Sequence, residues 1–155
     1  MSVKNSFDTN ILIYSLAGGH DETRGTPAIN AMVRDRNRKA LLAQALVAKP
    51  SVISVQLLNE FTNVARKKLG MTMQEIRPLI DNLAMVHSVM PIDLATLTLA
   101  LEVAEHTRYG IFDSNIIAVA LMAGCDTLYT EDMGHGRRLF DTLTIVNPFH
   151  TGIND

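Results

Sequence analysis

Apolar and polar positions follow two different spacings along this chain of 155 residues. Short runs bounded by polar residues or glycine predict strands over residues 3–7, 51–55, 86–92, 125–130 and 143–149, and the first of them is interrupted by Lys4, Asn5 and Ser6. Segments with helical spacing separate these runs, over residues 8–17, 28–48, 56–69, from 72 onward, 93–108 and 113–123. The pattern therefore alternates between strand and helix along most of the chain.

Residues with known end preferences mark the predicted helix boundaries. Predicted helix starts are Asp8 or Thr9, Thr72 with Glu75 in a capping box, Asp93 and Asp113. Predicted helix ends precede Gly18, Gly70 and Gly124. The helix over residues 28–48 is expected to break near Asn37, and Pro78 is expected to kink the helix that contains it.

Parallel strands need long crossover connections, and helices are their usual form. The alternation therefore predicts a mainly parallel sheet with helices on both faces, which is an α/β fold. No internal repeat, low-complexity segment or linker interrupts the pattern. We expect one domain over residues 1–155.

Composition excludes several classes of protein. Apolar residues make up 47% of the chain and charged residues 19%, which is typical of a folded domain and argues against disorder. The chain has 14 Lys and Arg against 16 Asp and Glu, a net charge of −2. This balance excludes a strongly basic nucleic-acid binder but leaves room for local basic patches.

Cysteine content and apolar run lengths bear on location. The single cysteine, Cys125, cannot form an internal disulfide, so nothing indicates an oxidising compartment. The longest apolar run, residues 116–125, is half the ~20 residues that a membrane-spanning helix needs. Asp8 separates Lys4 from the apolar run that follows, which argues against a secretory signal. We expect a cytoplasmic protein without a membrane anchor.

Four acidic residues are expected at one edge of the predicted sheet. Asp8 and Asp132 follow the ends of strands, and Glu60 lies within two turns of another strand end. Asp113 begins a helix whose N-terminus points to the same edge, where ligands bind in open parallel sheets. Each acid alone has an ordinary alternative as a cap, a solvated helix residue or a turn residue. Their convergence favours a site.

Carboxylates that converge must be neutralised. Two of them about 5 Å apart repel by roughly 3 kcal/mol at an effective dielectric of about 20, so protons or a cation must offset the repulsion. Oxygen ligands without a thiolate favour a hard ion, Mg²⁺ or Mn²⁺. Such ions hold phosphates, activate water and stabilise charge on a leaving oxygen, so the predicted chemistry is phosphodiester hydrolysis.

Three segments carry a resemblance to a known family. They read FDTNILIY at residues 7–14, LLNEF at residues 57–61 and FDSNIIAVALMAGCDTLYTEDMGHG at residues 112–136. In this order they resemble PIN-domain proteins, most closely the VapC-like ribonuclease toxins of bacterial toxin–antitoxin pairs. The first strand of this chain is more polar than that of the family.

The resemblance implies a fold, an activity and partners. It marks Asp8, Glu60, Asp113 and Asp132 as the catalytic and metal-binding acids, with Asn10 and Thr130 as polar residues that support them and the substrate. It implies a three-layer α/β/α sandwich on a mainly parallel sheet, bound Mg²⁺ or Mn²⁺, and cleavage of RNA. It also implies a homodimer and a small antitoxin protein that holds the enzyme inactive.

Basic residues gather in three groups that could flank such a site. The groups are Arg34, Arg36, Arg38 and Lys39; Arg66, Lys67 and Lys68; and Arg137 with Arg138. An RNA strand that crosses an acidic centre needs positive charge for its phosphates. Arg137 and Arg138 follow Asp132 closely, and we predict that they bind the substrate. The ordinary alternative for every group is a solvated surface.

Other chemistries have less support. Glu102 and His106 share a helical face but have no third ligand nearby, and no GxSxG, GxGxxG or P-loop motif occurs. Two rival functions stay open: a non-catalytic RNA- or partner-binding module on the same fold, and a phosphatase with Asp8 as nucleophile. An antitoxin would be sought along the apolar segments at residues 11–17 and 41–48, although these could equally be core.

Overall fold

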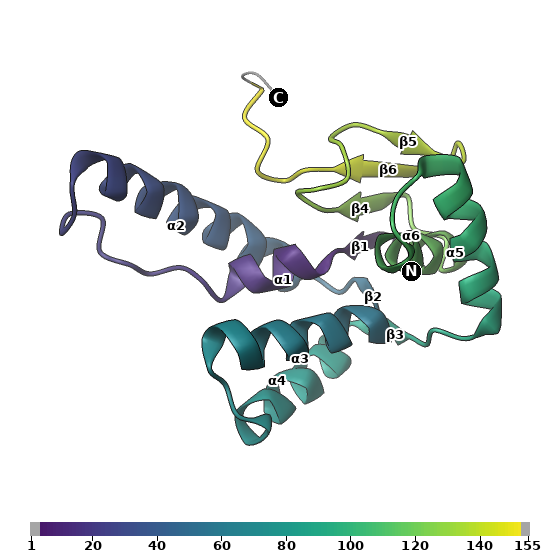
Figure 1. Ribbon diagram of the computed structural model, residues 1–155, viewed down its shortest axis with the longest axis horizontal. Helices are drawn as coiled ribbons and strands as arrows, with labels where there is room; N and C mark the ends of the chain where they lie inside the picture. Colours follow the sequence, from purple (N-terminus) through teal and green to yellow (C-terminus); the bar gives the residue numbers. More distant parts are fainter. Residues whose placement is uncertain (1–3, 153–155) are drawn as a thin grey trace.

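The computed structural model describes residues 4–152 and contains alternating helices and strands (Figure 1). The strands are β1 (Asn5–Phe7), β2 (Val52–Ser54), β3 (Ser88–Met90), β4 (Thr127–Tyr129), β5 (Arg138–Leu139) and β6 (Leu143–Val146). The helices are α1 (Thr9–Ser15), α2 (Pro27–Val47), α3 (Val55–Leu69), α4 (Met73–Val86), α5 (Leu94–Thr107) and α6 (Ile111–Met122). Over the described residues the predicted order of elements is therefore confirmed, except that β5 was not predicted.

The strands form one sheet in the order β3-β2-β1-β4-β6-β5. Every neighbouring pair is parallel except β5 with β6, which is antiparallel. β1 lies in the middle, where Ser6 pairs with Val52 of β2 on one side and with Leu128 of β4 on the other. The residues that follow β1 and β4 therefore emerge side by side at one edge.

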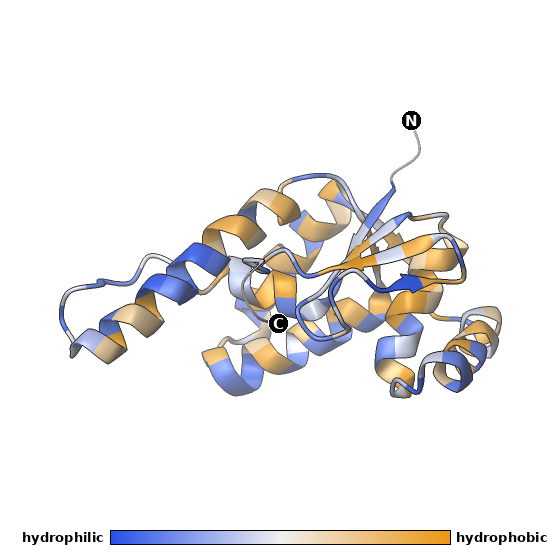
Figure 2. Ribbon diagram, turned by 90° about the horizontal axis from the view of Figure 1, so that it is seen from above, coloured by the Kyte–Doolittle hydropathy of each residue, from blue (hydrophilic) through white to orange (hydrophobic). Residues whose placement is uncertain are grey.

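Helices cover both faces of the sheet. Alternate residues of each strand point to opposite sides, so each face carries side chains that pack against a helical layer. Val52 and Leu128 belong to a core shared with α5 and α6, whereas Ile53 and Tyr129 belong to a core shared with α1, α3 and α4. In Figure 2 the strands of the sheet carry both apolar and polar residues. The predicted three-layer α/β/α sandwich on a mainly parallel sheet is confirmed.

The polar first strand fits the centre of the sheet. Ser6 and Phe7 are only 2% and 1% exposed, and hydrogen-bonded strands lie on both sides of them. The pairing satisfies the backbone of β1, and Phe7 supplies the apolar surface on one face. Val3, which the sequence also assigned to this strand, lies outside the described residues.

Several predicted boundaries were wrong. The strand predicted over residues 86–92 is limited to Ser88–Met90, because α4 extends to Val86. α2 does not break near Asn37, because that side chain bonds to the preceding loop instead, donating to the His20 carbonyl and to Glu22. α6 begins at Ile111 with Gly110 as its N-cap, so Asp113 lies within the first turn and is not the cap.

α2 is the longest helix, and its first half projects away from the sheet (Figures 1 and 2). Its second half packs on α1. The projecting part exposes Ile29 and Met32, and Leu41 further along the helix is 68% exposed. None of the helices in the described part of the chain is long and apolar enough to cross a membrane.

Candidate active site

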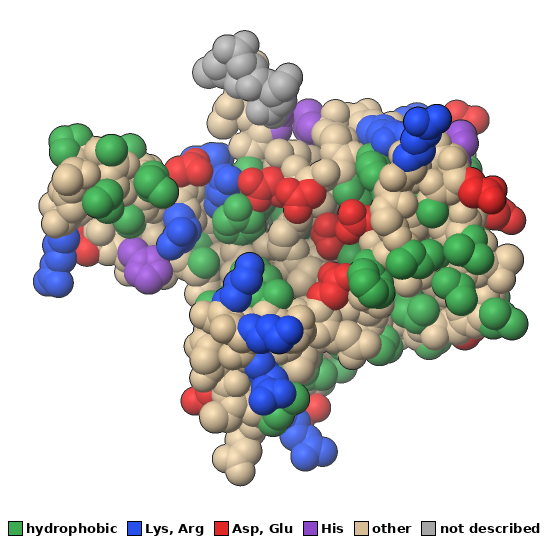
Figure 3. All heavy atoms as spheres, viewed as in Figure 1, with side chains coloured by type: hydrophobic (Ala, Val, Ile, Leu, Met, Phe, Trp, Pro, Cys, Tyr) green, Lys and Arg blue, Asp and Glu red, His purple; other side chains and the backbone are tan. Residues whose placement is uncertain are grey.

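The four predicted acids line one cavity of about 500 Å³ at the carboxyl edge of the sheet. Asp8 directly follows β1, Glu60 lies in the second turn of α3, Asp113 lies in the first turn of α6, and Asp132 follows β4. Figure 3 shows several acidic side chains in a row that runs from beside α3 past α1. The structure therefore brings together residues that are up to 124 positions apart (132 − 8).

Asp8 is the most buried of the four acids, at 6% exposure. Its Oδ1 caps α1 by accepting from the Thr9 N–H at 2.6 Å, and its Oδ2 accepts from the Thr130 hydroxyl at 2.9 Å. The pKa of Asp8 is raised to about 6, mainly by burial; the two hydrogen bonds lower it, and the charges of Asp113 and Glu60 contribute to the rise. Asp8 is thus a helix cap whose charged form is disfavoured by its surroundings.

Glu60 is held in place by two side chains. Its Oε2 accepts from the Thr9 hydroxyl at 2.5 Å, and its Oε1 accepts from the Gln56 amide at 2.9 Å. Gln56 lies one turn earlier on α3, where residues four apart share a helical face. These contacts fix the carboxylate against α1, on the wall of the cavity.

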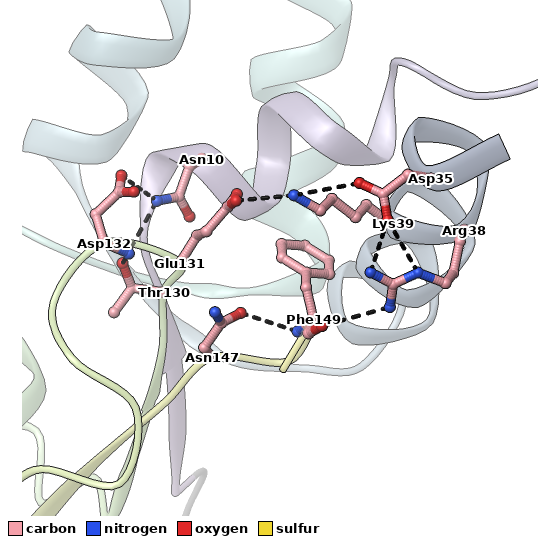
Figure 4. A network of polar contacts seen from close by, with 9 residues as sticks. All are labelled: Asn10, Asp35, Arg38, Lys39, Thr130, Glu131, Asp132, Asn147 and Phe149. Carbon is pink, nitrogen blue, oxygen red and sulfur yellow. Dashed lines mark hydrogen bonds and ion pairs between the residues drawn. The ribbon is translucent and has the colours of Figure 1, made fainter. Parts of the chain in front are cut away.

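Asp132 is oriented by Asn10 (Figure 4). The Asn10 amide nitrogen donates to Asp132 Oδ2 at 2.9 Å and to the Thr130 hydroxyl at 3.4 Å. The Asp132 N–H also donates to the Thr130 hydroxyl, at 3.3 Å. Asn10 and Thr130, both predicted as supporting residues, thus connect Asp8 to Asp132.

Asp113 differs from the other three acids because it accepts no hydrogen bond from any described residue. Its side chain is exposed to the cavity. Partial burial raises the pKa of Asp113, and the charges of Glu60 and Asp132 add to the effect. This carboxylate is therefore free to bind a ligand or a proton.

The donor chemistry suits a hard divalent cation. Asn10 Oδ1 is buried and accepts no hydrogen bond within the described part of the chain, so the site offers an amide oxygen beside its carboxylates. Among residues 4–152, however, no group of three or more His, Cys, Asp or Glu side chains is arranged so that it could hold a metal ion. Mg²⁺ commonly binds through only one or two carboxylates and keeps several waters, so an open arrangement fits it.

Comparison with known proteins identifies the family. A model of the PIN domain matches residues 7–138, which include all four acids. The chain belongs to the PIN domain family. The resemblance seen in the sequence is thereby confirmed at the level of the family.

A solved structure has the same fold as this PIN domain. It is described as a toxin-antitoxin complex from Klebsiella pneumoniae, and the match has a TM-score of 0.61 at 20% sequence identity. The match covers 94% of this chain and 97% of the other. No curated protein matches the sequence at a significant level.

The predicted substrate-binding arginines of the PIN domain lie away from the cavity lining. Arg137 donates to the Tyr109 hydroxyl at 2.7 Å, and Arg138 donates to the Asp141 carbonyl at the sheet edge. Lys68 of α3 lines the cavity instead. Figure 3 shows Lys and Arg side chains on the part of α3 that borders the acids. A role of Arg137 and Arg138 in RNA binding stays a prediction.

Sequence reasoning missed several supports of the PIN-domain site. Gln56 could have been found from its i, i+4 spacing to Glu60. Thr9 was considered only as a helix start, although its hydroxyl reaches Glu60. Tyr109 donates from its hydroxyl to the Met133 carbonyl and thereby ties the approach to Asp113 to the loop of Asp132. No local pattern marks that contact.

Proposed function

We propose that this protein is a metal-dependent endoribonuclease that cleaves RNA phosphodiester bonds. One observation carries the proposal: four carboxylates, each from a different element, line one cavity of a PIN domain. The raised pKa values of Asp8 and Asp113 support it, because a bound cation would stabilise the charged carboxylates that burial, and to a lesser extent their acidic neighbours, disfavour.

Asp8, Glu60, Asp113 and Asp132 would hold Mg²⁺ or Mn²⁺, some of them through water. When bound, such an ion polarises the phosphate, lowers the pKa of water and stabilises charge on the leaving oxygen. Asp113 accepts no hydrogen bond from any of the described residues. We therefore assign it the role of general base, which takes the proton from the attacking water. Water adds to phosphorus as the ester P–O bond breaks, and the leaving oxygen takes up a proton.

Positive charge beside the cavity suits a polyanionic substrate. Lys68 lines the same cavity as the acids, and Arg66 and Lys67 precede it in the last turn of α3. Lys68 would bind a phosphate of an RNA strand that enters this cavity. Arg137 and Arg138 would act further along the strand.

Cleavage of a fluorescent RNA library of mixed sequence tests the proposal. We expect cleavage with Mg²⁺ or Mn²⁺, no cleavage after removal of divalent ions with EDTA, and recovery when Mn²⁺ is restored. Absence of cleavage with either ion, together with retained RNA binding, would instead support the non-catalytic module. Cleavage that is unchanged in EDTA would exclude the metal mechanism.

The phosphatase alternative has little structural support. Asp8 is 6% exposed, and each of its carboxylate oxygens accepts a hydrogen bond. A nucleophilic aspartate needs one oxygen free to reach phosphorus. Phospho-aspartate trapped at Asp8 would be required to revive this function.

We also propose that the enzyme is the toxin of a toxin–antitoxin pair and acts in the cytoplasm. A solved structure with the same fold is described as a toxin-antitoxin complex. Of the segments suggested for antitoxin binding, residues 11 and 12 are core, whereas Leu16, Leu41 and Leu42 are exposed. A homodimer stays a prediction, and the exposed leucines Leu94 and Leu101 of α5 offer it an apolar face.

Growth of a bacterial host tests the toxin assignment. We expect induced expression of the wild-type chain to arrest growth, because cleaved RNA stops protein synthesis. Co-expression of the product of the adjacent gene should relieve the arrest. Normal growth at a protein level verified by immunoblot would contradict the assignment.

A further inference from the structure

The loop after β4 is attached to the rest of the molecule on both sides of Asp132. Before it, Glu131 Oε1 accepts from Lys39 of α2 at 2.9 Å. After it, the Met133 carbonyl accepts from the Tyr109 hydroxyl, and the Met133 side chain is buried. Asp132 thus projects into the cavity from a segment whose two neighbours are held.

The Lys39–Glu131 ion pair is partly buried, with side-chain exposures of 18% and 25%. The Lys39 ammonium lies 5.2 Å from the centre of the Tyr14 ring and 5.5 Å from that of Phe149. Asp35 approaches it at 3.7 Å. An ammonium packed against two aromatic rings loses freedom and water, so it holds its partner more firmly than a solvated lysine would.

A second contact ties the same part of α2 to the sheet (Figure 4). Arg38 donates to the Phe149 carbonyl at 3.4 Å and pairs with Asp35 at 2.9 Å. The Phe149 N–H donates to Asn147, just after β6. The part of α2 that holds Arg38 and Lys39 therefore contacts the segments that follow β4 and β6. Lys39 is the residue that contacts the segment after β4, where Asp132 lies.

We propose that Lys39 is a positioning residue that holds Asp132 toward the cavity through Glu131. The inference rests on the proposed function, because it gives the positioned carboxylate the task of binding a divalent ion. Lys39 itself does not line the acidic cavity and is not assigned any contact with the reacting atoms.

The direction in which cation affinity changes on mutation of Lys39 distinguishes a positioning role from a purely electrostatic one. Removal of a nearby positive charge strengthens the binding of a cation if the charge acts only through its field. Loss of a positioning contact weakens the binding, since residues that orient metal ligands commonly contribute 10–100-fold to affinity. Lys39→Met therefore gives opposite results under the two accounts.

The experiment measures Mn²⁺ affinity of the full chain by electron paramagnetic resonance, without RNA. We expect Lys39→Met to weaken binding about tenfold and Lys39→Arg to stay close to the wild type. Arg36→Met is the matched control, because Arg36 lies on α2 and lines the same shallow pocket as Lys39 but has no ion pair among the described residues. Unchanged or tighter binding by Lys39→Met would overturn the inference.

Hydrogen exchange of the metal-free protein supplies a second, independent result. We expect Lys39→Met to speed exchange at the amides of residues 131 and 132, while the amides of β1 and β4 keep their protection and report an intact fold. Unchanged exchange at residues 131 and 132 would overturn the inference whatever the metal result. A wild-type chain that binds no Mn²⁺ would overturn the proposed metal site, and the exchange result would still decide whether Lys39 positions the loop.

Discussion

Asp113→Asn should lower the rate of RNA cleavage by at least about a thousandfold while the fold stays intact, within the range for loss of acid–base catalysis and a metal contact. Asparagine keeps the size of the side chain but can neither accept the proton of the attacking water nor supply a full negative charge. Asp113 has no hydrogen-bond donor in the described part of the chain, so no structural contact is lost with the carboxylate.

Single-turnover cleavage with saturating Mn²⁺ measures this effect, and thermal unfolding followed by circular dichroism checks the fold. The midpoint of unfolding should stay level or rise, because the carboxylate with a raised pKa has been removed. Asp81→Asn on the exposed face of α4 is the matched control and should cleave as the wild type does. Cleavage by Asp113→Asn within threefold of the wild type would contradict the assigned role.

Asp8→Asn should stabilise the metal-free protein by about 2–3 kcal/mol at pH 7, from the energy that a pKa difference represents. The pKa of Asp8 is raised from 3.8 to about 6, mainly by burial. At neutral pH the folded state therefore holds an unfavourable buried charge. Asparagine removes the charge and can still accept the Thr9 N–H through its amide oxygen.

The gain should depend on pH in a defined direction. Below about pH 3 the carboxyl is protonated in both the folded and the unfolded state, so the two proteins should differ little there. As the pH rises toward 6 the unfolded state loses its proton first, and the wild type loses stability relative to Asp8→Asn. Above pH 6 the difference should be constant.

Urea unfolding in EDTA from pH 4 to pH 8 measures this difference directly. A stability difference independent of pH would show that the mutation acts through hydrogen bonding and not through charge. Added Mn²⁺ should reverse the order at neutral pH, because the ion binds the wild-type carboxylates and stabilises only the state that holds it.

The acids could be predicted from the sequence because each lies near the end of a strand or the start of a helix. Two predictions about the position of Asp8 agree with the structure: it follows a strand, and it caps a helix. Asp113 was placed at the right edge for the wrong reason, since Gly110 begins the helix without a side-chain cap. A first-turn acid and a cap both favour helix starts, so local sequence could not separate them.

The supports of the site could not be predicted in the same way. Lys39 and Glu131 are 92 residues apart, and neither stands in a motif that points to the other. β5 was missed because a strand of two residues has no periodicity, and only its pairing with β6 defines it. Such contacts depend on tertiary packing rather than on local preference.

The central place of β1 also has a consequence for biosynthesis. Asn5 pairs with Thr127, so β1 cannot pair with β4 until a segment 122 residues further along the chain (127 − 5) has been made. Asp8 and Asp132 cannot meet before that segment has left the ribosome, and closing so long a loop is slow. The candidate active site can therefore form only after the segment that carries Asp132 has been made.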